Sequence, residues 1–387
     1  EKSGEGAARP FGADPDRVPW ARVTQTRADT RGAGEPISHW GWSADMLTHF
    51  PGHELDLMYL TVPLRGDFQV DCELTGSPDR KIRLQYGGLA IGPNPDLKHL
   101  ERAQFGRPVA ELSVNPPLEK PAEWFPYRLV VKGGRMTAFI NGRKIHEAPA
   151  PPDVDPWVAF LAQDIQSGAA RKFTITGDPR IPDKVNLSAL PDLGGWLAAE
   201  YGDSVIGDDP DWDKRGEEIT GRVLEDITGS KQESVLRYHR PMIEDGRIEY
   251  EFYHDPGKVM VHPALGRLAF LLEPDGVKVH LLTDGAYERS GLTADNARDE
   301  PECRRGPTSL PLKPSAWNQL VLSVTGDKVT LELNGQPIYE RPIEPLNQRA
   351  FGLFHYADQT QVRVRNVSYQ GNWPRSLPAS LKGVDSH

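Results

Sequence analysis

Two stretches of nineteen residues are similar to each other and align without a gap. This internal repeat constrains the fold more than any other feature. The first copy runs from Trp124 to Gly142 and the second from Trp317 to Gly335, so equivalent positions lie 193 residues apart. Solenoid repeats are much shorter, about 20–50 residues, so this spacing indicates a duplicated domain. The chain of 387 residues is also long enough for two domains.

The pattern inside the repeat is that of paired strands. Leu320, Leu322 and Val324 alternate with neighbours of mixed polarity, and the apolar residues of 329–333 alternate with polar ones. A period of two gives each strand one apolar face, as in half-buried antiparallel strands. A Gly-Asp turn at 326–327 separates the two runs, and Asn334-Gly335 is a strong signal for a tight hairpin. We therefore expect an all-β fold of two antiparallel β-sandwiches in tandem.

The remaining segments are less regular. Further strands are expected over 55–62, 68–74 and 81–91. Residues 92–123 contain six prolines and no clear period, which predicts a loop region, and short helices are compatible with 45–50 and 197–201. Near Asn366 the apolar positions change from one parity to the other, which predicts a β-bulge at that point.

The repeat and the composition together predict how the chain is divided. A Pro-rich stretch at 177–183 is suited to the linker between the two sandwiches. The predicted parts are an irregular N-terminal arm (1–35), a first β-sandwich (36–185), a second β-sandwich (186–376) and a tail (377–387).

Charge and composition exclude several classes of partner. The net charge of -10 argues against nucleic acid and anionic membranes, because both need a basic face. No apolar run reaches the roughly 18 residues of a membrane span, so membrane insertion is not expected. Cys72 and Cys303 are too few for a disulfide framework, and we expect no bond between them. The sequence does not fix the oligomeric state.

Several motifs resemble a known superfamily. The motifs Trp317-Asn, Leu333-Asn-Gly, Phe351-Gly-Leu and Arg365-Asn-Val resemble the concanavalin A-like lectin/glucanase superfamily, near its 3-keto-disaccharide hydrolase-type domains. The resemblance implies a jelly-roll (concanavalin A-like) fold for each sandwich. It implies no particular reaction, because that superfamily contains lectins, hydrolases, lyases and adhesion modules.

A narrower resemblance lies within the second half. Arg240-Pro241, the run 249–253, the run 261–267 and the run 281–285 are similar to a domain family of unknown function that is abundant in planctomycete bacteria. This resemblance extends over about residues 190–375, and more loosely over 55–180.

Two carboxylates on one strand face are the candidate catalytic residues. Glu249 and Glu251 share that face with Arg247, and carboxylates at i and i+2 lie roughly 7 Å apart. The spacing suits a glycosidase pair, whose carboxyls lie roughly 5–10 Å apart. The alternative is an ordinary solvated strand face. That alternative is favoured by similar acids in the first half and by the absence of the Glu-x-Asp-x-x-Glu signature of laminarinase-type hydrolases.

Histidines gather in the second half and give the candidate substrate-binding residues. His280, Asp284, His355 and Tyr356 are expected to line one groove and to hydrogen-bond sugar hydroxyls. His262 and Arg267 flank a turn beside it, and Arg247, on the strand face of Glu249 and Glu251, completes the set. None of these second-half histidines shows a His-x-His or His-x-x-x-His spacing, so no metal site is assigned, although the sequence leaves calcium binding by loop oxygens open. No other cofactor is indicated.

Three functions remain open. The first is an extracytoplasmic carbohydrate-binding protein, secreted, periplasmic or at the cell surface, with a glycan or polysaccharide as partner. The second is a glycoside hydrolase or related glycan-processing enzyme, and the third is a structural module of a cell-envelope assembly. The chain begins at Glu1 without a signal-like segment, which suggests a processed or trimmed form. We expect the ligand site in the second half, where the stretch between first strand and hairpin is longer.

Overall fold

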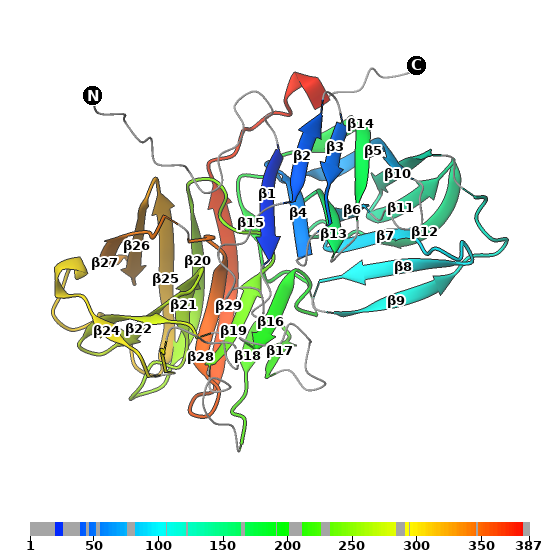
Figure 1. Cartoon of the computed structure of the whole chain (residues 1–387). Coiled ribbons are helices and arrows are strands. Elements are labelled where there is room, and N and C mark those ends of the chain that lie inside the picture. Colours follow the sequence, from blue (N-terminus) through cyan, green and yellow to red (C-terminus); the bar gives the residue numbers. More distant parts are fainter. Residues whose placement is uncertain are drawn as a thin grey trace, which may run out of the picture.

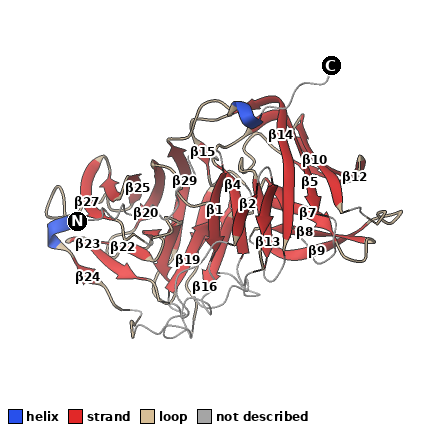
Figure 2. Cartoon of the chain, turned by 45° about the horizontal axis from the view of Figure 1, so that its top comes forward, coloured by secondary structure: helices blue, strands red, loops and turns tan. Residues whose placement is uncertain are grey.

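The fold is all-β in the computed structural model of the chain, and Figure 2 shows strands throughout. The structure describes residues 20–25, 39–43, 46–51, 55–75, 82–105, 107–120, 123–163, 167–190, 192–200, 211–225, 233–283, 291–293, 295–345 and 347–381. Within these ranges, helix is limited to two short 3-10 turns, η3 (Pro301–Cys303) and η4 (Ala379–Leu381). None of the described residues forms a helix long and apolar enough to cross a membrane.

Sheets A and B form the first sandwich. Sheet A has the order β1 (Trp20–Gln25), β4 (Leu55–Leu60), β13 (Ala159–Gln163), β6 (Arg83–Tyr86), β7 (Leu89–Pro93), β8 (His99–Gln104) and β9 (Arg107–Ser113). Sheet B has the order β12 (Arg143–Pro149), β11 (Arg135–Ile140), β10 (Trp124–Lys132), β5 (Arg65–Thr75), β14 (Gly168–Arg180), β3 (Met46–His49) and β2 (Trp40–Ser43).

Sheets A′ and B′ form the second sandwich. Sheet A′ has the order β16 (Trp196–Glu200), β19 (Glu233–Tyr238), β28 (Phe351–Tyr356), β21 (His262–Leu265), β22 (Leu268–Glu273), β23 (Gly276–Leu281) and β24 (Arg298–Asp299). Sheet B′ has the order β27 (Gln336–Pro342), β26 (Lys328–Leu333), β25 (Ala316–Thr325), β20 (Gly246–His254), β29 (Val362–Gly371), β18 (Glu218–Gly221) and β17 (Trp212–Arg215), and β15 (Val185–Asn186) also pairs with β29.

The two sandwiches have the same architecture. The order of sheet A matches that of sheet A′ strand for strand, and the order of sheet B matches that of sheet B′. Figure 1 shows β5–β12 on one side of the molecule and β20–β27 on the other. All the pairings are antiparallel, so the predicted fold class of tandem jelly-roll sandwiches is confirmed. Every strand of sheets A and B therefore has a counterpart strand in sheets A′ and B′.

The repeated hairpins form for a local reason. In both copies the Asn-Gly turn takes left-handed backbone angles, with φ of 50° and 76° at Asn141 and Gly142, and 52° and 79° at Asn334 and Gly335. Two consecutive positive φ values define the turn that matches the twist of paired strands, and Asn and Gly adopt them most readily. The hairpins predicted from these dipeptides are confirmed.

The predicted bulge is also confirmed. The pairing of β20 with β29 shifts register between Glu249 and Glu251, and Asn366 in β29 has a φ of 57°. The first half repeats the feature, because the pairing of β14 with β5 shifts next to Lys172, whose φ is 53°. One extra residue in β29, and one in β14, reverses which alternate residues of that strand face the core.

Some local predictions were wrong. Trp20–Gln25 belongs to sheet A rather than to an irregular arm, and Trp20 is buried against Phe160. The proline-rich region 92–123 contains β8 and β9, because its strands take their partners from elsewhere in the chain. Described residues within the two expected helices form β3 and β16 instead. Pairing to distant strands overrides weak local propensity.

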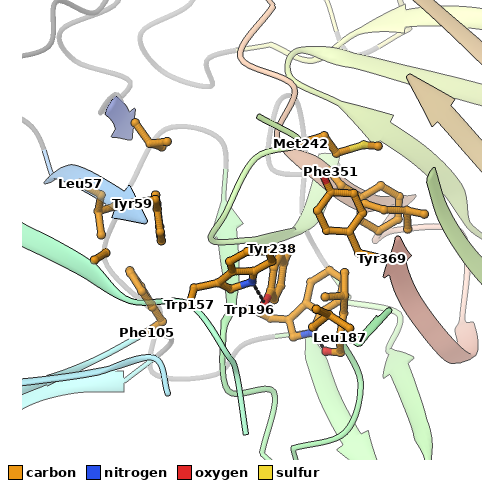
Figure 3. Close-up of a cluster of buried hydrophobic side chains, with 14 of the residues drawn as sticks. Leu57, Tyr59, Phe105, Trp157, Leu187, Trp196, Tyr238, Met242, Phe351 and Tyr369 are labelled. Carbon is orange, nitrogen blue, oxygen red and sulfur yellow. Dashed lines mark hydrogen bonds between the residues drawn. The ribbon is translucent and has the colours of Figure 1, made fainter. Parts of the chain in front are cut away.

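The two sandwiches meet through a buried network of hydrogen bonds. Tyr59 of β4 lies with its hydroxyl 2.6 Å from Nδ1 of His239, and Nε2 of His239 lies 2.8 Å from the Asp155 carboxylate. The Tyr238 hydroxyl donates to the same carboxylate and accepts a hydrogen bond of 3.0 Å from the Trp157 indole. Figure 3 shows these aromatic side chains converging from both halves.

An arginine strengthens the same contact. Arg240 is buried, with its guanidinium 3.6 Å from the centre of the Trp157 ring and 2.9 Å from the Glu244 carboxylate. It also donates to the carbonyl of Thr61 in the first half. Cation–π stacking and a charge-assisted hydrogen bond together offset the cost of burying the charge.

Candidate functional site

The candidate site lies on the outer face of sheet A′, the face turned away from sheet B′. In β28, Leu353 points into the sandwich core, whereas Phe354 and Tyr356 point outward. In β19, Leu236 points inward and Val235 outward. Side chains of six residues meet on this outer face and form what we call the outer-face cluster: Glu233, His262, His280, Thr283, Phe354 and Tyr356.

Sheet A′ must curl strongly to form the cluster. Glu233 begins β19 and His280 lies in β23, and three strands separate them in the sheet order. A flat sheet would place them roughly 19 Å apart, at about 4.8 Å per strand. Their side chains nevertheless meet at 2.6 Å. The outer face of sheet A′ is therefore concave.

Small residues make this curvature possible. Gly352, Ala264, Ala269 and His280 form one cross-strand row on the outer face. The small residues let neighbouring groups approach closely: a Cβ at Gly352 would lie 2.9 Å from Val235, and the rings of Phe354 and His280 stack with centroids 5.5 Å apart. The backbone of this row therefore lies directly beneath the aromatic rings of the cluster.

A buried carboxylate anchors one side of the cluster. Glu233 is 1% exposed and lies with Oε1 2.6 Å from Nε2 of His280. Its other oxygen accepts hydrogen bonds from the backbone N–H and the hydroxyl of Thr283, at 2.8 and 2.7 Å. Both oxygens of this carboxylate are held by hydrogen bonds, to His280 in β23 and to Thr283 just after that strand. Glu233 therefore fixes the orientation of His280.

The two imidazoles of the cluster differ in which nitrogen is used. Nδ1 of His262 accepts a 3.0 Å hydrogen bond from the backbone N–H of Leu272, which leaves Nε2 facing the cluster. Nε2 of His280 is used by Glu233, and Nδ1 of His280 is buried with no hydrogen-bond partner among the described residues. A buried polar atom without a partner is unusual, because burial alone costs free energy.

Burial shifts the pKa values of two groups in the cluster. Burial first, and then the neighbouring His355 and His280, lower the pKa of His262 to about 3. This imidazole is therefore neutral near pH 7. Burial, followed by Glu233, Asp295 and other acidic groups, raises the pKa of Tyr356, so its hydroxyl keeps its proton. A neutral imidazole and a protonated phenol therefore lie beside the aromatic rings of the cluster.

The structure brings together three of the predicted substrate-binding residues. His262, His280 and Tyr356 all belong to the outer-face cluster. The expectation that His355 lines the same groove was wrong, since successive strand residues point to opposite faces. Nε2 of His355 lies 2.8 Å from the Asp211 carboxylate on the inner side of the sheet, where its ring contacts Trp212.

Arg267 and Asp284, which were also predicted to bind substrate, are not among the six residues that define the outer-face cluster. Arg267 follows β21 and donates to the carbonyl of Leu282 at 2.8 Å, so it joins two neighbouring hairpins at the edge of the cluster. Asp284 lies outside the described residues.

The candidate catalytic pair lies on the outer face of the other sheet. Glu251 makes a 2.6 Å ion pair with Arg365. Glu249 accepts a hydrogen bond from Gln319 and lies 3.7 Å from Lys184. The side chains of both acids are about a third exposed. Arg247, on the same face, donates to the side chain of Gln370 at 3.2 Å.

This face carries a structural pattern that the two halves share. The guanidinium of Arg365 lies 4.0 Å from the centre of the Trp317 ring while it pairs with Glu251. In the first half, Arg171 lies 4.1 Å from the centre of the Trp124 ring and pairs with Glu73 at 2.6 Å. The repeated tryptophans therefore stack under arginines on the sheet surface. A pattern present in both sandwiches is typical of strand packing.

The first sandwich has no equivalent of the outer-face cluster. Register places Leu161, Arg83 and Ala103 where the second half has Phe354, His262 and His280. Arg83 is buried and paired with Glu101. Near Tyr59 the same face is covered by the second sandwich. Counterpart positions thus carry imidazole and aromatic groups only in the second half.

Glu233, Thr283 and Phe354 are members of the cluster that the sequence-based prediction did not include. Glu233 precedes the apolar run Val235-Leu236, and a charged residue at the start of a buried strand was the available signal. Its partner in β23 is 47 residues away, and only curvature of the sheet brings them together. Among the described residues, no group of three or more His, Cys, Asp or Glu side chains gathers as a metal site would require. Cys72 and Cys303 are not bonded to each other.

Comparison with known families gives two matches. Residues 227–376 match a family described as a domain of unknown function, DUF1583_N. Residues 128–212 match a family described as a protein of unknown function, DUF1581. Comparison with curated proteins gives no match.

Three solved structures that resemble parts of this chain are distant from it in sequence. A carbohydrate-binding module, CBM66 from Bacillus subtilis, is 11% identical with a TM-score of 0.30, over 40% of this chain and 95% of the module. A putative glycosyl hydrolase from Parabacteroides distasonis is 14% identical with a TM-score of 0.32, over 49% of this chain and 93% of that one. Domains LG4-5 of the mouse laminin alpha1 chain are 10% identical with a TM-score of 0.25, over 87% of this chain and 92% of that one. At such values we draw no ligand or activity from these likenesses.

Proposed function

We propose that the protein binds carbohydrate through the outer-face cluster of the second sandwich and acts outside the cytoplasm. The observation that carries the proposal is the buried Nδ1 of His280, which has no hydrogen-bond partner among the described residues and lies beside the rings of Phe354 and Tyr356. A sugar presents apolar C–H faces that pack on aromatic rings and hydroxyls that pair with fixed polar groups. Aromatic rings and neutral hydrogen-bonding atoms on one concave face match both parts of that chemistry.

The comparison between halves supports a site in the second sandwich. Leu161 and Ala103 offer no hydrogen bond at the counterpart positions, and Arg83 is held by Glu101. The first sandwich instead uses its outer face to hold the second one, through Tyr59 and His239. In this proposal the first sandwich is the scaffold and the second sandwich carries the ligand site.

A glycan-processing enzyme is the second candidate, and one observation favours it. A carboxylate that holds an imidazole in a fixed orientation, as Glu233 holds His280, is also how a general base is positioned. The unpartnered nitrogen would then receive a proton from the bound sugar. Binding and turnover are separable by experiment.

The test is a glycan array with the purified full chain, followed by titration calorimetry and product analysis on each glycan that binds. We expect at least one polysaccharide to bind and to be recovered without cleavage or modification. Release of shorter or modified sugars would support the enzyme instead. A chain that is folded by circular dichroism and binds no glycan would contradict both.

A further inference from the structure

The orientation of the two imidazoles determines which of their atoms can donate and which can accept. Nδ1 of His262 accepts from a backbone N–H, so the proton of this neutral ring is on Nε2. Nε2 of His280 faces a carboxylate that already accepts two hydrogen bonds from Thr283, so Nε2 carries the proton it donates. His262 therefore presents a donor, and in the neutral tautomer that donates from Nε2 to Glu233, Nδ1 of His280 is an acceptor.

The lone pair of His280 needs a donor that the described residues do not supply. His280 is fully buried, and Phe354 stacks on its ring at an interplanar angle of 28°. The neighbouring outer-face positions in its row are Ala269 and Ala264, which carry no polar group. A hydroxyl or amide N–H from a ligand would satisfy this nitrogen.

Four acidic side chains face three basic ones around the cluster, and two of the basic ones, Arg237 and Arg267, donate to the backbone carbonyls of Gly266 and Leu282. Glu233 lies within it, and Asp295, Glu273 and Asp358 act on the Tyr356 hydroxyl from neighbouring segments. Lys278, on the outer face of β23, is paired with Glu273. His262 is neutral near pH 7 and supplies no compensating charge. A carboxylate or sulfate group would therefore enter a site of like charge.

We infer that the outer-face cluster selects uncharged saccharides, through a sugar hydroxyl that donates to Nδ1 of His280, and rejects uronic-acid and sulfated polymers. This inference rests on the proposed function and names the substrate class of the same site. The hydroxyl supplies the missing donor, and the surrounding carboxylates oppose any anionic substituent.

The test compares neutral and acidic polysaccharides on the full chain. Laminarin, xylan and mannan are the neutral probes, and alginate and polygalacturonate are the acidic ones, all measured by affinity electrophoresis and calorimetry at pH 7. At least one neutral polymer is expected to bind at least tenfold more tightly than either acidic polymer. The difference is expected to shrink at high salt, because screening weakens like-charge repulsion.

One substitution isolates the nitrogen. A glutamine amide reaches the position of Nε2, so His280→Gln keeps the contact with Glu233 and removes the acceptor at Nδ1. We expect it to weaken neutral-glycan binding about tenfold or more, since a buried hydrogen bond is lost. His355→Gln, a buried histidine on the opposite face of the same sheet, is the matched control and is expected to bind as the wild type does. Unfolding midpoints of both variants show whether each is folded.

The possible results separate the two proposals. Equal or tighter binding of alginate would overturn the selection of uncharged sugars while leaving carbohydrate binding in place. Unchanged binding by a folded His280→Gln variant would overturn the role of Nδ1. Absence of binding to every probe and to the glycan array would overturn the proposed function itself.

Discussion

At the scale of single residues, the second sandwich is distinguished by how it uses histidine. His262 and His280 share a concave face, but each is held through a different nitrogen. His355 is one residue away from Tyr356 in the chain and faces the opposite side of the sheet. Burial and hydrogen bonding, rather than residue type, decide which imidazole can meet a ligand.

The first prediction concerns the response of His262 to acid. Its pKa in the folded protein, about 3, is below the ordinary value of 6.5, so folding favours the neutral ring. Its contribution to stability is therefore complete above about pH 6.5 and is lost as pH falls toward 3, at about 1.4 kcal/mol per pH unit. Urea unfolding of the wild type and of His262→Asn at pH 7, 6 and 5 measures this slope.

The His262→Asn variant is expected to lose stability less steeply on acidification. The asparagine carbonyl can accept the hydrogen bond from Leu272 that Nδ1 accepts in the wild type, and it does not titrate. Parallel pH profiles for the two proteins would contradict the buried, neutral state of His262.

At the scale of elements, strands that occupy the same place in the two halves differ mainly in what their outer faces carry. The ladder of tryptophan, arginine and glutamate on sheets B and B′ is retained, from Trp124 with Arg171 to Trp317 with Arg365. The outer faces of sheets A and A′ have diverged into an inter-domain contact and a concave polar cluster. The outer faces of sheets B and B′ thus keep the same packing, whereas those of sheets A and A′ differ.

The second prediction concerns the candidate catalytic pair. Glu249→Gln and Glu251→Gln are expected to leave glycan binding unchanged and to lower the free energy of unfolding by no more than about 1 kcal/mol, as for partly exposed ion pairs. Glu73→Gln, at the counterpart of Glu251 in the first half, is expected to have a similar effect on stability. Loss of binding or turnover in Glu249→Gln or Glu251→Gln, but not in Glu73→Gln, would support the hypothesis that this pair is catalytic.

At the scale of the whole molecule, the halves are held together by a polar network instead of a purely apolar contact. The Asp155 carboxylate receives hydrogen bonds from Tyr238 and His239, and His239 is in turn contacted by Tyr59. Phe105 stacks on His239 with ring centroids 4.4 Å apart. Buried polar groups of this kind fix orientation, because any other arrangement would leave them unpaired.

The third prediction tests this network. Asp155→Ala removes the shared acceptor and leaves two buried donors unpaired, so it is expected to lower the free energy of unfolding by about 3 kcal/mol or more. Asp153→Ala, two residues away and paired with Arg65 at the surface, is the control and is expected to cost about 1 kcal/mol at most. Similar midpoints for the two variants in urea would show that the network does not stabilise the contact.

The sequence by itself determined the fold class and the duplication. Alternating apolar residues, Asn-Gly turns and the repeated run from Trp124 to Gly142 are local signals, and local sterics act identically in both copies. The bulge at Asn366 was predictable for the same reason, because a change of apolar parity is visible along one strand. His262, His280 and Tyr356 were predictable as polar residues on strands of the longer half.

Only the tertiary structure decided which of these residues meet. Strand order and the curl of sheet A′ join Glu233 to His280, although no spacing in the sequence connects them. The same structure sends His355 to the inner side and pairs Glu251 with Arg365 on another sheet. Pairing between distant strands sets register, and register sets the face on which every side chain lies.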